Sequence, residues 1–407
     1  MLARPRLERA RMTETLPPPD ADARAHSARL EALIREEIAA HGGAIPFSRF
    51  MELALYAPGL GYYSAGATKF GAAGDFITAP ELGPLFAACV ADALAPVLQQ
   101  IGEDAQFMEI GAGSGAFAVV TLKRLMALDA LPARYAILEP SADLRVRQRE
   151  RLQERLVPPL FELVEWLDGP IEDEWQGVVF ANEVIDALPT SRFVIGEEGE
   201  VREEYVSSYA DGGFLFTQHD ADAMLLAAVK HVEAALDAPF APGYRSEILP
   251  QLPYWVQAVI GRLTRGALLF CDYGYVRREY YGAWRDEGTL RAFRQHHVVP
   301  NVMQYPGLQD ITASVDFTAL AEAGTNAGFD LSGYATQAVF LLGNGLDKRL
   351  AEAEEKAKDE VARLRLRHET RQLTVPEAMG ERFQFIGFER GVEFEHAFIA
   401  GDMSWRL

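Results

Sequence analysis

The chain has 407 residues, of which 49% are hydrophobic and 24% are charged, a composition typical of a globular protein with a large core. Its formal net charge is −20 and its isoelectric point is about 4.9. A negative electrostatic field of this size disfavours non-specific nucleic-acid binding and suits a cationic partner, although a need for solubility alone also explains the charge. The two cysteines, Cys89 and Cys271, are too few for a disulfide framework or a Cys-rich zinc site.

Residues 1–27 are predicted to be a flexible tail, because Pro17-Pro18-Pro19 cannot continue a helix and its flanks are polar. Residues 1–12 contain four arginines and one acid, which fits a short organelle transit peptide or an upstream start with Met12 as the initiator. No apolar run approaches the length of a membrane span. We predict a cytoplasmic, bacterial location, or the mitochondrial matrix if this segment is a transit peptide.

Residues 28–100 are predicted to form a helical cap. Apolar residues lie on one face of a helix over 28–41, a second helix covers 47–55, and a third runs from about 81 to 101. Residues 56–86 between them are rich in glycine and aromatic residues, and loops of such length in a compact domain are usually functional or disordered. The interleaved aromatic residues favour an ordered, functional loop.

The most informative segment is 107–117, where apolar residues lead to Glu109, then to Gly111, Gly113 and Gly115, and then to a helical run. Glycines serve where the backbone takes positive φ or approaches a ligand, and a helix N-terminus offers free N–H groups. The spacing differs from the G-x-G-x-x-G of dinucleotide-binding turns. A carboxylate at Glu109 repels a pyrophosphate but attracts an ammonium, such as the amino-acid end of S-adenosylmethionine.

Residues 101–407 alternate strands with helices, which predicts a doubly wound α/β sheet. Two segments interrupt the alternation, a small β insertion at about 190–220 and a less regular one at 275–312. The predicted strands are 106–111, 134–139, 160–164, 177–182, 267–272, 336–343 and 393–400. The predicted helices include 142–156, 221–236, 314–327 and 347–371.

Polar residues follow several of these strands, where an open α/β sheet binds its ligand. Glu139 ends the second strand and can accept both ribose hydroxyls of a nucleoside, or else cap the next helix. Asn182, Glu183 and Asp186 end the fourth. On a helical turn the two acids share a face, so they can hold a guanidinium or ammonium group, with a helix-capping pair as the structural alternative.

Asp272 and Tyr273 follow the fifth strand and are candidate substrate contacts. His296 is a candidate base or substrate contact, and an exposed surface histidine is the equal alternative. No His or Cys spacing supports a metal site.

Together these segments resemble the MidA-like group of class I S-adenosylmethionine-dependent methyltransferases, over about residues 28–402. The matching segments are Gly61-Tyr62-Tyr63, Phe70 to Glu81, Glu109 to Gly115, Glu139, Asn182 to Pro189, Asp272 to Gly274, Gly288-Thr289-Leu290, Pro306 to Phe317 and Met379-Gly380-Glu381. The resemblance implies a Rossmann-like, seven-stranded, mostly parallel sheet with a reversed last strand. It implies cofactor binding at Gly111, Gly113, Gly115 and Glu139, and a role for Asp75 near the cofactor or substrate.

The eukaryotic members of the group are mitochondrial complex I assembly factors described as protein arginine methyltransferases. The resemblance therefore implies methylation of an arginine in a protein substrate with an exposed basic segment, such as a respiratory-complex subunit. Val184 and Ile185 stand where many relatives carry aromatic residues, which leaves the acceptor open. A small-molecule methyltransferase and an assembly chaperone with a methyltransferase fold are the alternatives.

Overall fold

The computed structural model describes residues 17–64, 78–210 and 212–407. Asp75 and the arginine-rich residues 1–12 lie outside these ranges. A central sheet of eight strands carries the order β15-β16-β10-β5-β2-β3-β4, and β14 pairs with the end of β10. All neighbours are parallel except β16, which runs antiparallel to β10 and β15. The strands are β2 (Gln106–Ile110), β3 (Arg134–Leu138), β4 (Val164–Leu167), β5 (Glu174–Asn182), β10 (Arg262–Tyr275), β14 (Val315–Asp316), β15 (Asp330–Thr336) and β16 (Phe383–Arg390).

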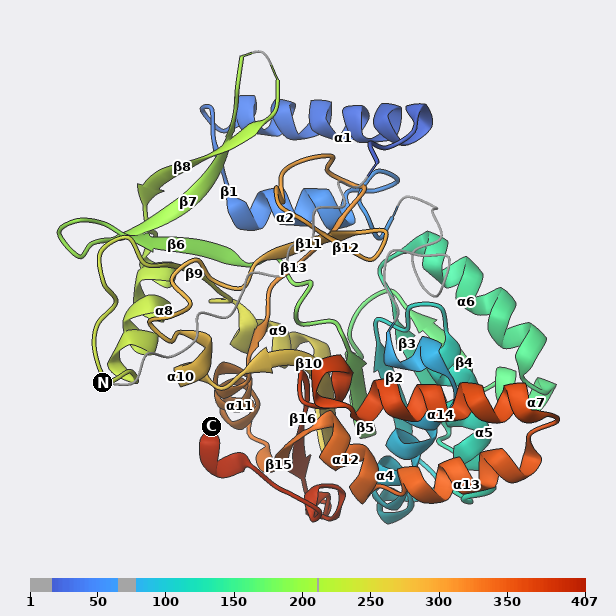
Figure 1. Ribbon diagram of the computed structural model, residues 1–407. Coiled ribbons are helices and arrows are strands. Elements are labelled where there is room, and N and C mark those ends of the chain that lie inside the picture. Colours follow the sequence, from blue (N-terminus) through green and yellow to red (C-terminus); the bar gives the residue numbers. More distant parts are fainter. Residues whose placement is uncertain (1–16, 65–77, 211) are drawn as a thin grey trace.

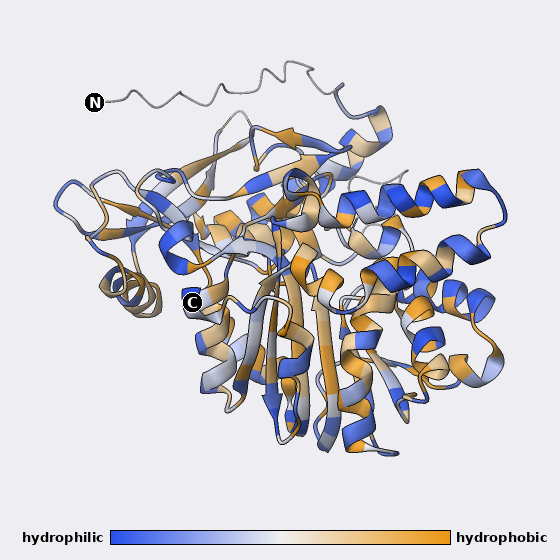
Figure 2. Cartoon of the chain, turned by 60° about the horizontal axis from the view of Figure 1, so that its bottom comes forward, coloured by the Kyte–Doolittle hydropathy of each residue, from blue (hydrophilic) through white to orange (hydrophobic). Residues whose placement is uncertain are grey.

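Helices cover both faces of this sheet, and the strands between them are hydrophobic (Figure 2). One core is built with α4 (Leu85–Ile101), α5 (Ala116–Ala127), α6 (Ala142–Arg155), α7 (Pro158–Phe161), α12 (Gln337–Gly343), α13 (Leu346–Lys356) and α14 (Glu360–Thr374). The opposite core is built with α9 (Leu252–Ile260) and α11 (Phe317–Asn326). Burial on both faces explains why the strands are continuous apolar runs.

A cap lies beyond the carboxyl ends of the parallel strands (Figure 1). It joins α1 (Ala21–Ala40), β1 (Ile45–Pro46), α2 (Phe47–Tyr56) and α3 (Ala79–Leu82) to two insertions. The first insertion holds β6 (Ser191–Ile195), β7 (Val201–Ser208), β8 (Phe214–Asp220), α8 (Ala223–Ala234) and β9 (Arg245–Ile248), and β1 pairs with β7. The second holds α10 (Arg277–Tyr280), β11 (Arg291–Arg294), β12 (His297–Val299) and β13 (Asp310–Thr312). A third core lies between α1, α2 and these insertions.

The predicted α/β class, the mostly parallel sheet and the reversed strand are confirmed, but several boundaries were wrong. Residues 336–343 form α12, because Thr336 caps a helix there by accepting from Val339 N, and the strand precedes it as β15. Residues 393–400 contain a 3₁₀ turn, and the strand is β16 at 383–390. In the predicted strand 160–164, residues 160–161 end α7 and β4 begins only at Val164, and 347–371 is two helices.

The cap also differs from the predicted boundaries. Helix α1 begins at Ala21, where Asp20 accepts from Ala23 N, so this helix starts within the predicted tail. Helix α4, which begins at Leu85, packs in the core of the central sheet, although the predicted cap extends to residue 100. The first insertion extends to β9, and the second contains the three-stranded sheet β12-β11-β13. No helix in the described ranges has the length and apolarity needed to cross a membrane.

Candidate functional site

A cavity of about 430 Å³ lies at the carboxyl ends of β2, β3 and β5. The turn from Gly111 to Ser114 forms part of its wall, together with Glu109, Glu139, Asn182 and Glu183. Two cap tyrosines, Tyr56 and Tyr63, and two α9 residues, Trp255 and Val259, also line it. The sheet edge therefore brings together six of the sequence-predicted residues that follow three separate strands.

The glycine turn has left-handed backbone at every other residue. The φ angles of Gly111, Gly113 and Gly115 are +66°, +52° and +80°, a region that side chains disfavour. At Gly111 a Cβ atom would also lie 2.9 Å from Val184 Cγ2, which belongs to the segment after β5. Two separate constraints thus require glycine at this position, and they keep the β2–α5 turn close to the acidic segment.

Glu109 lies at the floor of the cavity and is only 3% exposed. Its Oε2 accepts a hydrogen bond of 2.6 Å from the Tyr135 hydroxyl on β3. Burial raises the pKa of Glu109 to about 8, although the Tyr135 bond opposes the shift. At neutral pH this carboxyl is therefore mostly protonated in the absence of a nearby cation.

Glu139 stands at the end of the neighbouring strand β3 and faces the same cavity. Its Oε1 accepts from Ser141 N at 2.9 Å, and its Oε2 lies 3.2 Å from Gln148 Nε2 on α6, the donor. These bonds fix the carboxylate in the position where a nucleoside ribose lies in folds of this topology.

Asn182 and Glu183 end strand β5 and also line the cavity. Asn182 Nδ2 donates to Glu183 Oε1 at 3.2 Å, while Asn182 Oδ1 is buried and accepts no hydrogen bond from the described residues. Glu183 has a φ of +52°, which is uncommon for a residue with a side chain and characteristic of functional sites. Burial and the neighbouring Asp186 raise the pKa of Glu183 to about 8, against hydrogen bonds from Asn182 and from the Ala79 backbone.

Asp186 does not share a helical face with Glu183 as predicted. The segment after β5 is not helical, and the left-handed residue Glu183 turns the chain. Asp186 lines a second cavity of about 290 Å³, between the first insertion, α9 and α11. Burial together with Asp272 and Asp310 raises its pKa well above the usual value. The two acids therefore act on each other electrostatically while facing different spaces.

Asp272 supports the chain around Asp186 and lines neither cavity. Its Oδ2 accepts from Ile185 N at 3.0 Å and from Asp186 N at 3.2 Å, and its Oδ1 accepts from Tyr273 N at 2.8 Å. These three bonds hold the turn that follows β5. Burial, and then the charge of Glu183, raises the pKa of Asp272 to about 8.

Tyr273 and His296 are not brought to the first cavity either. Tyr273 packs edge-on against Phe383 with 5.6 Å between ring centroids, and burial next to Asp186 raises its pKa well above the usual value. His296 is exposed in the turn between β11 and β12, with a φ of +64°. The surface alternative for His296 is thus the one that the structure favours.

Sequence reasoning missed the two tyrosines of the cap. Tyr56 and Tyr63 stack with 5.5 Å between their centroids and 24° between their planes. The Tyr56 hydroxyl donates to Ala187 O at 2.9 Å, and the Tyr63 hydroxyl donates to Asp310 Oδ1 at 2.8 Å. The aromatic character of the loop indicated function, but its place in the same cavity as Glu183 depends on the tertiary fold.

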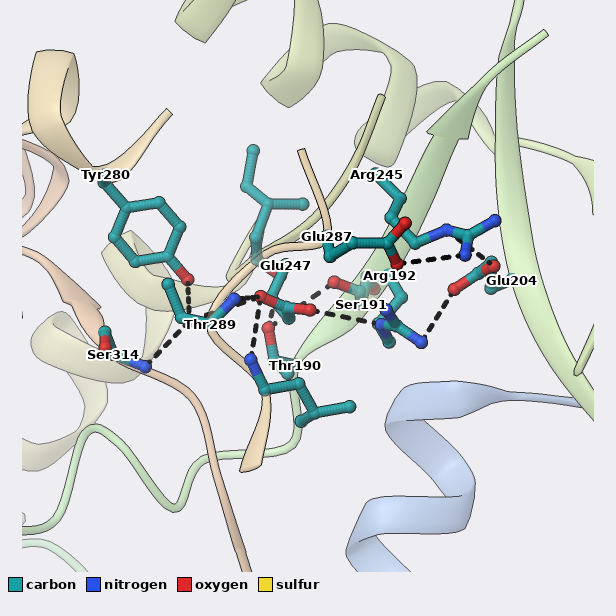
Figure 3. Close-up of polar contacts among 12 residues, drawn as sticks. Thr190, Ser191, Arg192, Glu204, Arg245, Glu247, Tyr280, Glu287, Thr289 and Ser314 are labelled. Carbon is teal, nitrogen blue, oxygen red and sulfur yellow. Dashed lines mark hydrogen bonds and ion pairs between the residues drawn. The ribbon is translucent and has the colours of Figure 1, made fainter. Parts of the chain in front are cut away.

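The motif Gly288-Thr289-Leu290 has a structural explanation (Figure 3). Glu247, a fully buried residue of β9, accepts from Thr289 N at 2.6 Å and from Leu290 N at 3.3 Å. Its other oxygen accepts from Arg192 Nε at 3.2 Å, and Arg192 also pairs with Glu204 at 2.8 Å. The motif thus joins the two insertions away from the first cavity.

The first cavity is strongly acidic. Its described lining contains Glu81, Glu109, Glu139, Asp168 and Glu183, and Arg145 is the one lysine or arginine among the described lining residues. Arg145 is itself engaged, by Asp168 at 2.6 Å and by Glu139 O at 2.5 Å. Across the described residues, no group of three or more His, Cys, Asp or Glu side chains has the arrangement of a metal site. The cavity is therefore suited to an organic cation.

Residues 89–335 match a family described as "putative S-adenosyl-L-methionine-dependent methyltransferase". The chain is 29% identical to the Drosophila melanogaster protein arginine methyltransferase NDUFAF7 homolog, mitochondrial, over 93% of this chain and 89% of the relative. It is also 29% identical to the Danio rerio protein of that name, over 84% of this chain and 83% of the relative.

A crystal structure from Burkholderia thailandensis bound to S-adenosyl-homocysteine is 42% identical, with a TM-score of 0.89 over 97% of this chain and all of that one. A second structure from that organism is 40% identical with a TM-score of 0.85. Both the family match and these neighbours agree with the glycine turn and the acidic cavity. The chain belongs to this methyltransferase family, and the predicted resemblance to MidA-like class I enzymes with S-adenosylmethionine as cofactor is confirmed.

Proposed function

We propose that this enzyme methylates an arginine side chain of a protein. The observation that carries the proposal is that Glu183 and Asn182, whose Oδ1 accepts no hydrogen bond from the described residues, both line the acidic cavity. Both are hydrogen-bond acceptors, and a guanidinium group offers five N–H donors and no acceptor. A neutral hydroxyl has a single donor and would leave one of the two acceptors unpaired, and a carboxylate would be repelled, which in either case costs binding energy.

The cavity fits S-adenosylmethionine by its donors and its shape. Gly111 and Gly113 keep side chains away from one wall, and Glu139 presents a fixed carboxylate for two ribose hydroxyls. Gly115 does not line the cavity, and a Cβ there would face Leu152 and Gln148 of α6. The acids of the cavity suit a cofactor that is itself a cation. When bound, this cofactor supplies a methyl group activated by a positively charged sulfur. The assignment of Asp75 to the same site stays a prediction, since that residue lies outside the described ranges.

The chain's own contribution to the reaction is positioning. Methyl transfer is a displacement in which alignment of the acceptor supplies much of the rate. Glu183 and Asn182 would hold the guanidinium from one side, and Tyr56 and Tyr63 would limit its movement from the cap. The acceptor nitrogen loses a proton as it gains the methyl group, and the Glu183 carboxylate is placed to receive that proton.

Asp186 then has a supporting role in place of the predicted direct one. Its carboxyl faces the second cavity, but it raises the pKa of Glu183. A negative charge there favours a cation next to Glu183. Asp272 would act further back, by fixing the Asp186 backbone.

The relatives named above support a protein acceptor, because their names state protein arginine methylation. We infer a partner with an exposed basic segment, which the net charge of −20 also suits. A role like respiratory complex I assembly stays a prediction. So does a cytoplasmic location, with the mitochondrial matrix as the alternative.

The test is transfer of a labelled methyl group to proteins in a cell lysate, with the wild type, Glu183→Gln and an exposed control, Glu103→Gln. We expect label in methylarginine, lost in Glu183→Gln and kept in the control. Label in a small metabolite with no labelled protein would favour a small-molecule methyltransferase. Absence of transfer despite cofactor binding would favour an assembly chaperone, and equal labelling by both variants would refute the role of Glu183.

A further inference from the structure

We propose that Glu81, a residue of the cap, binds the α-ammonium group of the cofactor's amino-acid end, and that Arg151 positions it. This inference rests on the proposed cofactor site at the glycine turn. It assigns to a cap residue the binding of the ammonium group, which the sequence suggested for Glu109. It also means that the cofactor site is incomplete without a segment from outside the methyltransferase sheet.

Glu81 lies in α3, a segment distant in sequence, and contacts the glycine turn. Its side chain is 13% exposed and lines the cavity. The Ser114 hydroxyl in the turn donates a short hydrogen bond to Glu81 Oε1, and Arg151 Nη1 on α6 lies 3.3 Å from the same oxygen. Oε2 has no hydrogen-bond or ion-pair partner among the described residues and so is available to a ligand.

The other acids of the cavity are less suited to an ammonium group at the turn. Both oxygens of Glu139 are engaged by Ser141 and Gln148. Asp168 is 97% exposed at its side chain and pairs with Arg145. Glu109 lies beneath the turn, bonded to Tyr135, in a setting that favours the protonated carboxyl. Glu183 is the acid assigned to the acceptor.

The α3 segment is held firmly enough to place a carboxylate. The Ala79 N–H donates to the Glu183 carboxylate at one end of α3. Beyond the other end, where α4 begins, Glu369 on α14 accepts from Leu85 N at 2.6 Å. Positioning by these bonds, by Ser114 and by Arg151 reduces the freedom that binding must remove.

Arg151 also determines what charge the ligand can carry. It is hydrogen-bonded to Ser114 Oγ and paired with Glu81, and it stands outside the cavity lining. A charge-assisted hydrogen bond to an ammonium group is stronger than a neutral one. The Glu81–Arg151 pair therefore favours ligands that carry an ammonium group over ligands whose side chain stops at the thioether sulfur and lacks the amino-acid end.

The test compares two ligands by calorimetry with the full-length protein at pH 7.5. S-Adenosylhomocysteine carries the amino-acid end, whereas 5′-methylthioadenosine has the same nucleoside and thioether without it. For Glu81→Gln we expect the affinity for S-adenosylhomocysteine to fall at least about tenfold. The affinity for methylthioadenosine should stay within about twofold. Circular dichroism confirms that the variant is folded.

Two further variants separate the alternatives. Glu109→Gln should leave the preference for S-adenosylhomocysteine over methylthioadenosine within about threefold of the wild type, and Arg151→Gln should reduce that preference. If Glu81→Gln weakens the binding of both ligands equally, Glu81 only stabilises the cap and the proposal is refuted. If Glu109→Gln removes the preference instead, Glu109 is the ammonium ligand. Absence of binding of either ligand to the wild type would refute the proposed cofactor site itself.

Discussion

The acceptor role of Glu183 predicts a strong pH dependence of acceptor binding. Burial raises the pKa of this carboxyl to about 8, with Asp186 and Asp310 adding to the shift and the Asn182 amide and Ala79 N–H opposing it. Only the ionised form attracts a guanidinium. The fraction ionised is about 1% at pH 6 and about half at pH 8, from the pKa alone. Affinity for a cationic acceptor should therefore rise about fiftyfold over that interval and level off above pH 9.

The assay is binding of a short peptide with one arginine to the protein saturated with S-adenosylhomocysteine, measured from pH 6 to pH 9. This product lacks the sulfonium charge, so it changes the pKa of Glu183 less than the methyl donor does. A peptide with citrulline in place of arginine has a similar shape without the charge, and its affinity should not change with pH. Glu183→Gln should bind the arginine peptide weakly at every pH, while Glu103→Gln should behave as the wild type.

Cys271 and Asp272 also lie within the electrostatic reach of Glu183, and their pKa values are raised too. Cys271 stays protonated between pH 6 and pH 9, and the titration of Asp272 would persist in Glu183→Gln, so the variant separates the effect of Asp272 from that of Glu183. A wild-type affinity that stays level between pH 6 and pH 9 would refute the reasoning. An equal slope in Glu183→Gln would assign the titration to another group.

Three further predictions concern the turn, the insertions and stability. Gly111→Ala should weaken S-adenosylhomocysteine binding more than tenfold in calorimetry, and adding Val184→Ala should restore it only in part, because the positive φ remains. Glu247→Ala should lower the free energy of unfolding by about 3–5 kcal/mol in urea titrations. The variant leaves Arg192 with one buried partner fewer and two backbone N–H groups without acceptors. A loss below about 1 kcal/mol would contradict this prediction. Glu109 has a folded pKa raised to about 8, so its stabilising effect is complete below its unfolded pKa of about 4.5 and lost as pH rises through 8. The urea midpoint of the wild type should therefore fall from pH 6 to pH 9, and the fall should be smaller in Glu109→Gln.

The parts of the fold with local signals were predictable from sequence. The glycine turn follows a short apolar strand and precedes a helix, and each of these features is encoded within a few residues. The final third of the chain was harder. Residues 337–343 form a short apolar run, which fits a buried helix or a strand equally well by periodicity. The Thr336 cap decides for the helix, and the last two strands of the chain then shift to 330–336 and 383–390.

The candidate site was predictable where strands end and unpredictable where distant segments meet. Glu109, Glu139 and Glu183 lie at the carboxyl ends of strands that are side by side, so the fold class alone brings them together. Asp186 was misplaced because a left-handed residue, Glu183, redirects the chain. Tyr63 and Glu81 reach the cavity through contacts with Asp310 and Ser114, which are more than 30 residues away in sequence. No local pattern encodes such contacts.

The position of α3 relates the two halves of the proposed reaction. Its first residue, Ala79, donates to Glu183 on the acceptor side, and its third, Glu81, contacts Ser114 on the cofactor side. One short segment is therefore sensitive to both ligands. A cation next to Glu183 stabilises the ionised carboxylate and so strengthens its hydrogen bond from Ala79 N. An ammonium group bound to Glu81 holds the same segment in place. Because coupling between sites is reciprocal, bound cofactor should raise acceptor affinity by the factor by which acceptor raises cofactor affinity. Glu81→Gln should reduce this coupling even at saturating cofactor.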